Sequence, residues 1–164
     1  MMIPAGKIAC PTDFSEAALL GVQHATDLAK HFRAELCLVN IVPELPTLTN
    51  DAEWVLKAPD KRLLHAEAEQ NLRNLATSIE LNQGIRVGTI VGHGDPASEI
   101  VQIAPDECAD MIVIATHGNT GWRHVAFGSV AERVVCLAPC PVTFTAAEAG
   151  HAVAQAVTAN RSSA

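Results

Sequence analysis

The chain has 164 residues, of which 49% are apolar and 18% charged, and its formal net charge is −7. This length suits one domain that buries roughly 70% of its unfolded surface, and it is too short for two ordinary domains. The composition excludes disordered, collagen-like and coiled-coil chains, and the scattered basic residues in an acidic chain argue against a nucleic-acid partner.

Hydropathy and cysteine content bear on the compartment. No apolar run approaches the ~20 residues that span a bilayer, and the N-terminus lacks the charged-then-apolar order of a secretory signal. We therefore expect a cytoplasmic protein that does not associate with a membrane. The five cysteines are an odd number, and we expect them to be reduced and mostly buried.

The first half of the chain alternates between strand and helix patterns. Apolar side chains recur at helical spacing between Ala17 and Phe32, and again along a later amphipathic stretch that Gly84 ends. A segment with three prolines and few periodic residues precedes this second helix. The predicted elements are a strand at 8–10, a helix at 17–32, a strand at 35–42, a loop at 43–59 and a helix at 60–82.

The second half continues the alternation. Asp95 and Pro96 are residue types that favour the N-cap and the first position of a helix. The entirely apolar run Met111–Ala115 predicts a strand that is covered on both faces. The predicted elements are a strand at 85–91, a turn at 92–95, a helix at 96–104, a strand at 111–115, a glycine-bearing segment at 118–128, a helix at 129–137 and a strand at 141–145.

This alternation predicts one α/β domain at residues 1–146, with a doubly wound, mostly parallel sheet and helices on both faces. Residues 147–164 are rich in alanine and have no large aliphatic residue beyond Val153 and Val157, so we expect a flexible C-terminal tail. In such a sheet, ligands bind beyond the carboxyl ends of the strands, where the strand order reverses. The residues that directly follow each strand are therefore the candidates for a site.

A glycine-bearing segment follows the strand at 111–115 and leads into a helix. Gly118, Gly121 and Gly128 let backbone N–H groups approach an anion closely, and the helix N-terminus adds about half a positive charge. The segment is thus a candidate phosphate cradle. Ser129, with Glu132 three residues later, also fits a capping box that serves only the helix end. The two roles are compatible, because a capping hydroxyl can also donate to a phosphate oxygen.

Two positions at other strand ends have alternative interpretations. Asp13 fits the N-cap of the first helix, although a carboxylate at this edge could also accept hydrogen bonds from ribose hydroxyls. Ile41 and Val42 fit the core of a strand, and they would also offer an apolar face and backbone groups to a base. From the residues alone, the structural role is favoured at each of these positions.

Four segments together resemble the universal stress protein family. The resemblance is collinear from residue 7 to about residue 145, which makes it more specific than any single glycine motif. The four segments are Lys7–Glu16 (KIACPTDFSE), Ala115–Gly121 (ATHGNTG), Phe127–Glu132 (FGSVAE) and Ala138–Val142 (APCPV). The resemblance implies a five-stranded parallel sheet of order 3-2-1-4-5, frequent dimers and, in one branch of the family, a bound ATP.

That branch has a Gly-x2-Gly-x9-Gly-Ser/Thr signature, which the resemblance places on Ala115, Gly118, Gly128 and Ser129. Alanine thus replaces the first glycine, and its methyl group would either crowd the nucleotide or narrow the pocket. By the same resemblance, the residues that would border the adenosine are Pro11, Thr12, Asp13 and Ile41. Those that would border the phosphates are Asn119, Thr120, Gly121 and Val130. A magnesium ion would be carried on the phosphates.

Other ligand sites fit the sequence less well. Residues 92–97 match the dinucleotide pattern G-x-G-x-x-A, but no carboxylate follows the next strand, and Pro96 removes an N–H that a pyrophosphate would use. A tight turn before a capped helix explains the same residues. No P-loop motif occurs. His93, His117 and His124 lack the spacing of a metal-binding helix.

Three function classes remain: a nucleotide-dependent regulatory module, a slow ATP hydrolase, and an interaction module that binds no nucleotide. We favour the first, because Arg123 is the only lysine or arginine between the glycines and no nucleophile or arginine cluster is present for fast phosphoryl transfer. We also expect a homodimer, because the strand at 141–145 would otherwise leave an exposed apolar edge.

Overall fold

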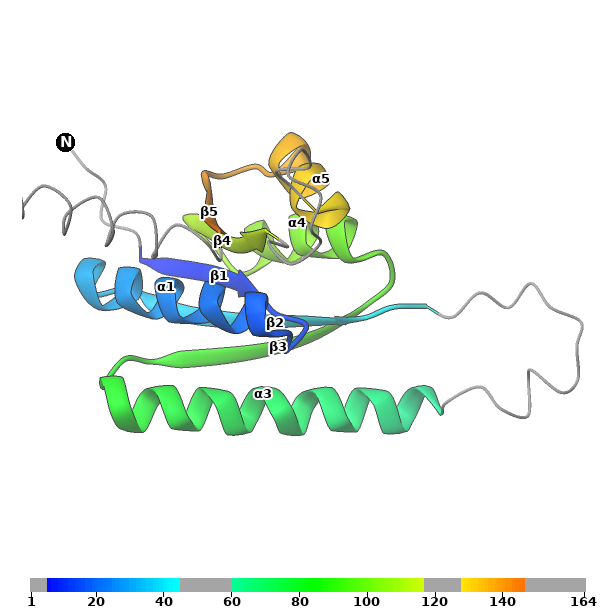
Figure 1. The fold of residues 1–164 in the computed structure, drawn as a ribbon, viewed down its shortest axis with the longest axis horizontal. Helices are drawn as coiled ribbons and strands as arrows, with labels where there is room; N and C mark the ends of the chain where they lie inside the picture. The colour runs from blue at the N-terminus through cyan, green and yellow to red at the C-terminus, as the bar shows by residue number, and fades with distance from the viewer. Residues whose placement is uncertain (1–5, 45–59, 117–127, 147–164) are drawn as a thin grey trace, which may run out of the picture.

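The computed structural model describes residues 6–44, 60–116 and 128–146. Strands and helices alternate along them (Figure 1). In chain order the elements are β1 (Lys7–Pro11), α1 (Glu16–Phe32), β2 (Glu35–Val42), α3 (Lys61–Gln83), β3 (Val87–His93), α4 (Pro96–Asp106), β4 (Met111–Thr116), α5 (Ser129–Leu137) and β5 (Val142–Ala146). The predicted tail lies outside the described residues, as do the predicted loop after Glu44 and the glycine segment before Gly128.

The five strands are all parallel and lie in the order β3-β2-β1-β4-β5. This confirms the predicted fold class and the strand order that the family resemblance implies. The order reverses at β1, which pairs with β2 on one side and with β4 on the other. The chain leaves β1 for α1 on one face and leaves β4 toward α5 on the other, so a crevice opens between the two exits.

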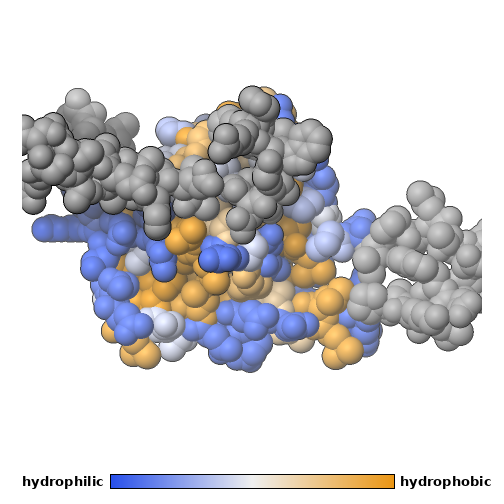
Figure 2. Space-filling model, in the orientation of Figure 1, coloured by the Kyte–Doolittle hydropathy of each residue, from blue (hydrophilic) through white to orange (hydrophobic). Residues whose placement is uncertain are grey.

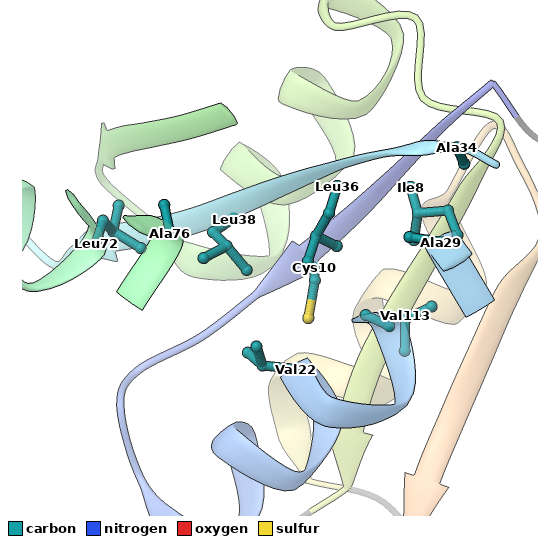
Figure 3. Close-up of a cluster of buried hydrophobic side chains, with 11 residues drawn as sticks. Ile8, Cys10, Val22, Ala29, Ala34, Leu36, Leu38, Leu72, Ala76 and Val113 are labelled. Carbon is teal, nitrogen blue, oxygen red and sulfur yellow. The ribbon is translucent and has the colours of Figure 1, made fainter. Parts of the chain in front are cut away.

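Strand alternation divides the core into two clusters, one on each face of the sheet. On the face covered by α1 and α3, the cluster includes Ile8 and Cys10 of β1 and Leu36 and Leu38 of β2, all fully buried (Figure 3). The intervening residue Ala9 faces the opposite way, into the cluster below α4 and α5. Burial on both faces explains why the central strands consist mostly of apolar residues.

α1 lies close to the sheet because its buried stripe consists mostly of small side chains. The buried residues are Ala18, Gly21, Val22, Ala25, Thr26 and Ala29. The apolar spacing between Ala17 and Phe32 predicts this helix correctly, but the buried stripe is offset by one residue from the larger side chains that create the spacing. Leu28 and Phe32 pack at the border of the stripe and stay partly exposed.

α3 is the longest described helix, with 23 residues. The Asp60 carboxylate caps its start, and Gly84 ends it in the left-handed conformation (φ 67°), as the sequence predicts. Hydrophilic side chains cover much of the lower edge of the molecule, where α3 lies (Figure 2). None of the described helices is long and apolar enough to cross a membrane.

The end of β3 differs from the prediction. The sequence predicts a turn from Gly92 onward, but Gly92 and His93 remain in β3, paired with Ile41 and Val42 of β2. The chain turns at Gly94, whose φ of 127° is favourable only for glycine. A Cβ at position 92 would lie 2.6 Å from Ile41 Cδ1, so the end of the Ile41 side chain would have to shift to make room for it.

The prediction that the cysteines are mostly buried was wrong. Cys10 and Cys37 are buried, whereas Cys108 and Cys136 are exposed and Cys140 is intermediate. Burial raises the pKa of the Cys10 thiol to about 12 and that of Cys37 to about 11. The two core thiols are therefore protonated and unreactive at neutral pH.

Candidate functional site

A cavity of about 150 Å³ opens where the strand order reverses. The carboxyl ends of β1, β2 and β4 form its floor, and residues of α1, α4 and α5 contribute to its walls. The lining residues are Pro11, Thr12, Asp13, Ser15, Ala17, Ala18, Val39, Asn40, Ile41, Pro96, Ile100, Ile114, Ala115, Val130 and Ala131. Asp13 is the one charged side chain among these described lining residues, and most of the others are apolar.

The structure brings half of the predicted site residues together in this cavity. They are Pro11, Thr12, Asp13, Ile41, Ala115 and Val130. Gly128 and Ser129 directly precede Val130 at the start of α5, without lining the cavity themselves. The remaining four, Gly118, Asn119, Thr120 and Gly121, lie outside the described residues. The residues expected to border an adenosine are thus close together.

The turn between β1 and α1 is held by its own side chains. The Thr12 hydroxyl accepts a hydrogen bond from the Phe14 N–H at 3.1 Å, and Asp13 Oδ1 accepts one from the Ser15 N–H at 3.0 Å. Ser15, and not Asp13, is the N-cap of α1, and its hydroxyl accepts from the Ala18 N–H. The prediction of Asp13 as the N-cap was wrong, because the chain uses two more residues to turn from the strand into the helix.

Phe14, at the centre of this turn, has a φ of 61°. A bulky residue in the left-handed region is strained by roughly 1–2 kcal/mol, and such strain is concentrated at functional sites. The hydrogen bonds accepted by Thr12 and Asp13 offset it locally. The turn therefore holds the Asp13 carboxylate at the rim of the cavity in a conformation that the isolated chain would not favour.

Asn40 is a site residue that the sequence analysis did not single out. Its side chain is 9% exposed within β2, and its Nδ2 donates to the Thr12 carbonyl oxygen at 2.8 Å. The Thr12 N–H donates in turn to the Val39 carbonyl oxygen at 2.8 Å, so β2 fixes the turn that carries Asp13. A signal for this role was present, since one amide in an otherwise apolar strand is costly to bury unless it has a partner.

The start of α5 also differs from the prediction. Gly128 is the N-cap, and Ser129 is the first helical residue, with an exposed side chain. The capping box predicted for Ser129 and Glu132 is therefore not formed, because the helix begins one residue too early for it. Glycine has no side chain with which to cap the helix, so the N-cap leaves the first N–H groups of α5 available to an anion.

The methyl group of Ala115 is directed toward α1. A Cβ at Gly21 would lie 3.2 Å from the Ala115 Cβ and 3.4 Å from its backbone nitrogen. The absence of a side chain at Gly21 therefore makes room for the alanine that replaces the first glycine of the signature. Ala115 is part of the lining of the cavity.

An ion pair joins α4 to α5 beside the cavity. Asp95 caps α4 as predicted, with Oδ2 accepting from the Ser98 N–H at 3.0 Å, and Arg133 of α5 donates to Asp95 Oδ1 at 2.8 Å. The Arg133 hydrogen bond, followed by those from Ser98, holds the pKa of Asp95 well below its usual range. Because both side chains are about half exposed, the pair adds little stability. Its main effect is to keep Arg133 engaged on α4.

The histidines considered as metal ligands do not form a site in the described part of the chain. His93 Nε2 lies 2.9 Å from His65 Nδ1, whereas His117 and His124 lie outside the described residues. No group of three or more His, Cys, Asp or Glu side chains within the described ranges is arranged to hold a metal ion.

Comparison with known proteins identifies the family. The model of the universal stress protein family matches residues 5–145. The chain belongs to the universal stress protein family. It is 38% identical over 138 residues to the universal stress protein MJ0531 of Methanocaldococcus jannaschii, covering 83% of this chain and 79% of the relative.

Solved structures agree with the family and with the fold. The solved structure of MJ0577, a further relative from M. jannaschii, is 31% identical and has a TM-score of 0.70, covering 90% of this chain and 99% of that one. The universal stress protein UspA from Lactobacillus plantarum is 27% identical with a TM-score of 0.69, covering 84% and 95%. The predicted family and its five-stranded sheet are therefore confirmed.

We expect Gly21→Ala and Ala115→Gly to be energetically coupled. The methyl group added at position 21 would lie 3.2 Å from the Ala115 Cβ, and Ala115→Gly removes that contact. The free energy of unfolding of the two single variants and the double variant, measured with denaturant, should show Gly21→Ala to be more favourable by about 0.5–1 kcal/mol in the Ala115→Gly background than beside the natural alanine. Gly88→Ala is the control, since its Cβ would meet only Glu35 Oε1 at 3.6 Å. Additivity of the test pair would contradict the packing role of Gly21.

Proposed function

We propose that this chain is a cytoplasmic regulatory protein of the stress response that binds ATP in the cavity and acts as a nucleotide-dependent switch. One observation carries the proposal: an apolar cavity, a carboxylate and a helix N-terminus meet where the order of a parallel sheet reverses. A nucleotide requires these three parts, namely an apolar slot for the base, an acceptor for the ribose and N–H donors for the phosphates.

The parts of the cavity suit different parts of ATP. The apolar side chains of Pro11 and Ile41 would contact the base, and the Asp13 carboxylate would accept hydrogen bonds from the ribose. The N–H groups at Gly128 and Ser129 would donate to the phosphates, together with the segment 118–121 that the family signature assigns to them. Since no lysine or arginine is among the described lining residues, a magnesium ion bound to the phosphates would supply positive charge.

Two structural neighbours support the choice of an adenine nucleotide. A universal stress protein from Archaeoglobus fulgidus was solved in complex with dAMP (23% identity, TM-score 0.59), and another universal stress protein in complex with cAMP (18% identity, TM-score 0.64). At these identities the likeness concerns the fold alone. An adenine nucleotide is accordingly the first ligand to test on this chain.

Calorimetric titration with ATP and Mg²⁺ should show binding below millimolar concentration. Gly128→Val should weaken it by about tenfold or more, because a branched side chain at the start of α5 would obstruct the N–H donors. Gly88→Val is the matched control, since it makes the same change at the other end of the sheet, where a Cβ has ordinary space. The absence of ATP binding to the unmodified protein would contradict the proposal and favour the interaction module.

The hydrolase alternative is less well supported by the site. Phosphoryl transfer requires cations and an oriented base around the transferred group. The described lining residues include no lysine, arginine or histidine, and Arg133 is held by Asp95 at 2.8 Å. The described part of the cavity therefore suits ground-state binding, which by itself does not accelerate chemistry.

Single-turnover measurements with labelled ATP should accordingly give hydrolysis far slower than the ~10 per second typical of enzymes. Arg133→Gln should leave that slow rate unchanged, because Arg133 pairs with Asp95. His117→Ala and Arg123→Ala test two basic residues that follow β4, both outside the described residues. Hydrolysis at ordinary enzyme rates that either variant abolishes would establish a hydrolase instead.

A homodimer through β5 is the quaternary part of the proposal. β5 is an edge strand, and Val142, Thr143 and Phe144 are partly exposed. The Ile112 N–H donates to the Pro141 carbonyl at 2.9 Å. Alternation along a parallel ladder then directs the N–H group of Val142 away from β4. Among the described strands β5 pairs only with β4, and such an apolar edge strand favours pairing with a second copy.

Light scattering should therefore give twice the chain mass of 17.3 kDa. Val142→Pro should give monomers, because it removes an outward N–H while keeping the hydrogen bonds to β4. Thr89→Pro makes an equivalent change in β3, the other edge strand, and should leave the dimer intact. A monomer at micromolar concentration, or a dimer that survives Val142→Pro, would contradict this interface.

A further inference from the structure

A second cavity, of about 350 Å³, lies at the amino ends of the strands, at the opposite end of the sheet from the first. It forms where α1 and α3 end, toward the left of Figure 1. We call it the basic cavity, and it is lined by Lys30, Arg33, Ala34, Gln83, Gly84, Ile85 and Arg86. Three of these residues are positively charged and none is negative, in a chain with a formal net charge of −7.

The three cations have few partners of their own. Lys30, in the last turn of α1, donates through Nζ to Gln83 Oε1 at 2.9 Å and so links the ends of α1 and α3. Arg86 approaches the Glu35 carboxylate at 3.8 Å, but its side chain is 85% exposed, so this pair is weak. Within the described ranges, no side chain pairs with the guanidinium of Arg33.

An ordinary role for cations here would be to balance the two helix ends. A helix C-terminus carries about half a negative charge, so α1 and α3 together contribute about one. The Glu35 carboxylate divides its charge between Arg86, at 3.8 Å, and Lys7, at 3.7 Å. Glu80, in the last turn of α3, accepts from the Val87 N–H. The three cations that line the cavity outnumber the one unit of negative charge at the two helix ends, so its lining is positively charged.

The backbone of Arg33 provides an independent argument. Arg33 is the C-cap of α1 with a φ of 56°, and Gly84 ends α3 at the same cavity with a φ of 67°. Glycine adopts this conformation without steric cost, whereas arginine is strained in it. The cap needs only the backbone, because the Arg33 N–H donates to the carbonyls of Ala29 and Lys30. The helix end therefore does not itself require an arginine at this position.

We propose that the basic cavity binds a small oxyanion of the phosphate class, held between the guanidinium groups of Arg33 and Arg86 with Lys30 as a third charge. A planar guanidinium donates two parallel hydrogen bonds to such an anion, and two guanidinium groups from different elements bind it from two sides. The same chemistry recognises free inorganic phosphate and the phosphate of a small monoester. The site is separate from the ATP cavity and does not depend on the proposed function.

The test is a titration of the full chain with inorganic phosphate, and in parallel with glycerol phosphate, at constant ionic strength, followed by backbone amide chemical shifts. The amides of residues 33–34 and 84–86 should shift and saturate. Arg33→Gly should weaken the affinity by about tenfold, while its melting temperature stays equal or rises because glycine relieves the strained cap. Arg86→Gln should weaken binding similarly. Preference for either ligand supports the proposal and identifies the source of the phosphate.

Arg73→Gln is the matched control, because it removes one exposed positive charge from the outer part of α3 and should change the affinity less than twofold. Equal weakening by Arg73→Gln and Arg33→Gly would mean a diffuse electrostatic effect and would overturn the site. Shifts confined to Gly128–Val130 would assign the anion to the other cavity and overturn it as well. Unchanged phosphate affinity in Arg33→Gly would also overturn the site.

Discussion

Burial of both faces of the central strands is the constraint on which the rest of the structure depends. Side chains of β1, β2 and β4 alternate between two helical layers, so a polar group without a partner is costly on either face. Asn40 is accommodated because it donates to the Thr12 carbonyl, and Thr116 because it donates to the Thr145 carbonyl at 3.3 Å. These buried polar residues of the strands all lie toward the carboxyl ends. Among the described strand residues, the buried polar side chains therefore lie toward the end of the sheet at which the cavity opens.

The same constraint explains the strained turn after β1. α1 packs flat on the sheet through small side chains, so the chain must reverse into it within the four residues 12–15. Phe14 adopts the left-handed conformation at this reversal. The turn is fixed by hydrogen bonds in which Asn40 donates to the Thr12 carbonyl and in which the Thr12 hydroxyl and the Asp13 carboxylate accept from backbone N–H groups. A turn that is already fixed loses little conformational entropy when a ligand binds. The strained turn thus fixes the conformation of the cavity rim before a ligand binds.

Elements with a strong period or clear ends were predictable from the sequence, and the exact starts of helices were not. β2 is apolar apart from Glu35 at its start and Asn40, and α3 lies between a capping aspartate and a glycine. Each of two helix starts has two candidate N-caps: Asp13 and Ser15 for α1, and Gly128 and Ser129 for α5. The course of the chain in the folded protein decides between them. Topology indicated which segments after the strands could form a site, and the family resemblance assigned the individual residues to parts of a nucleotide. Asn40 was missed because its role is a hydrogen bond between segments 28 positions apart in sequence.

The effect of the alanine at the first signature position depends on the surface against which it packs. Glycine at that position leaves room between β4 and the helix that crosses it. In this chain the room comes from the other side, because Gly21 of α1 faces the Ala115 methyl at a distance where any further Cβ would be crowded. β4 and α1 must lie close together, and a glycine in either element can provide the space for this. An alanine at position 115 is therefore compatible with an open cavity, and the size of the residue at position 21 of α1 matters to this part of the structure as well.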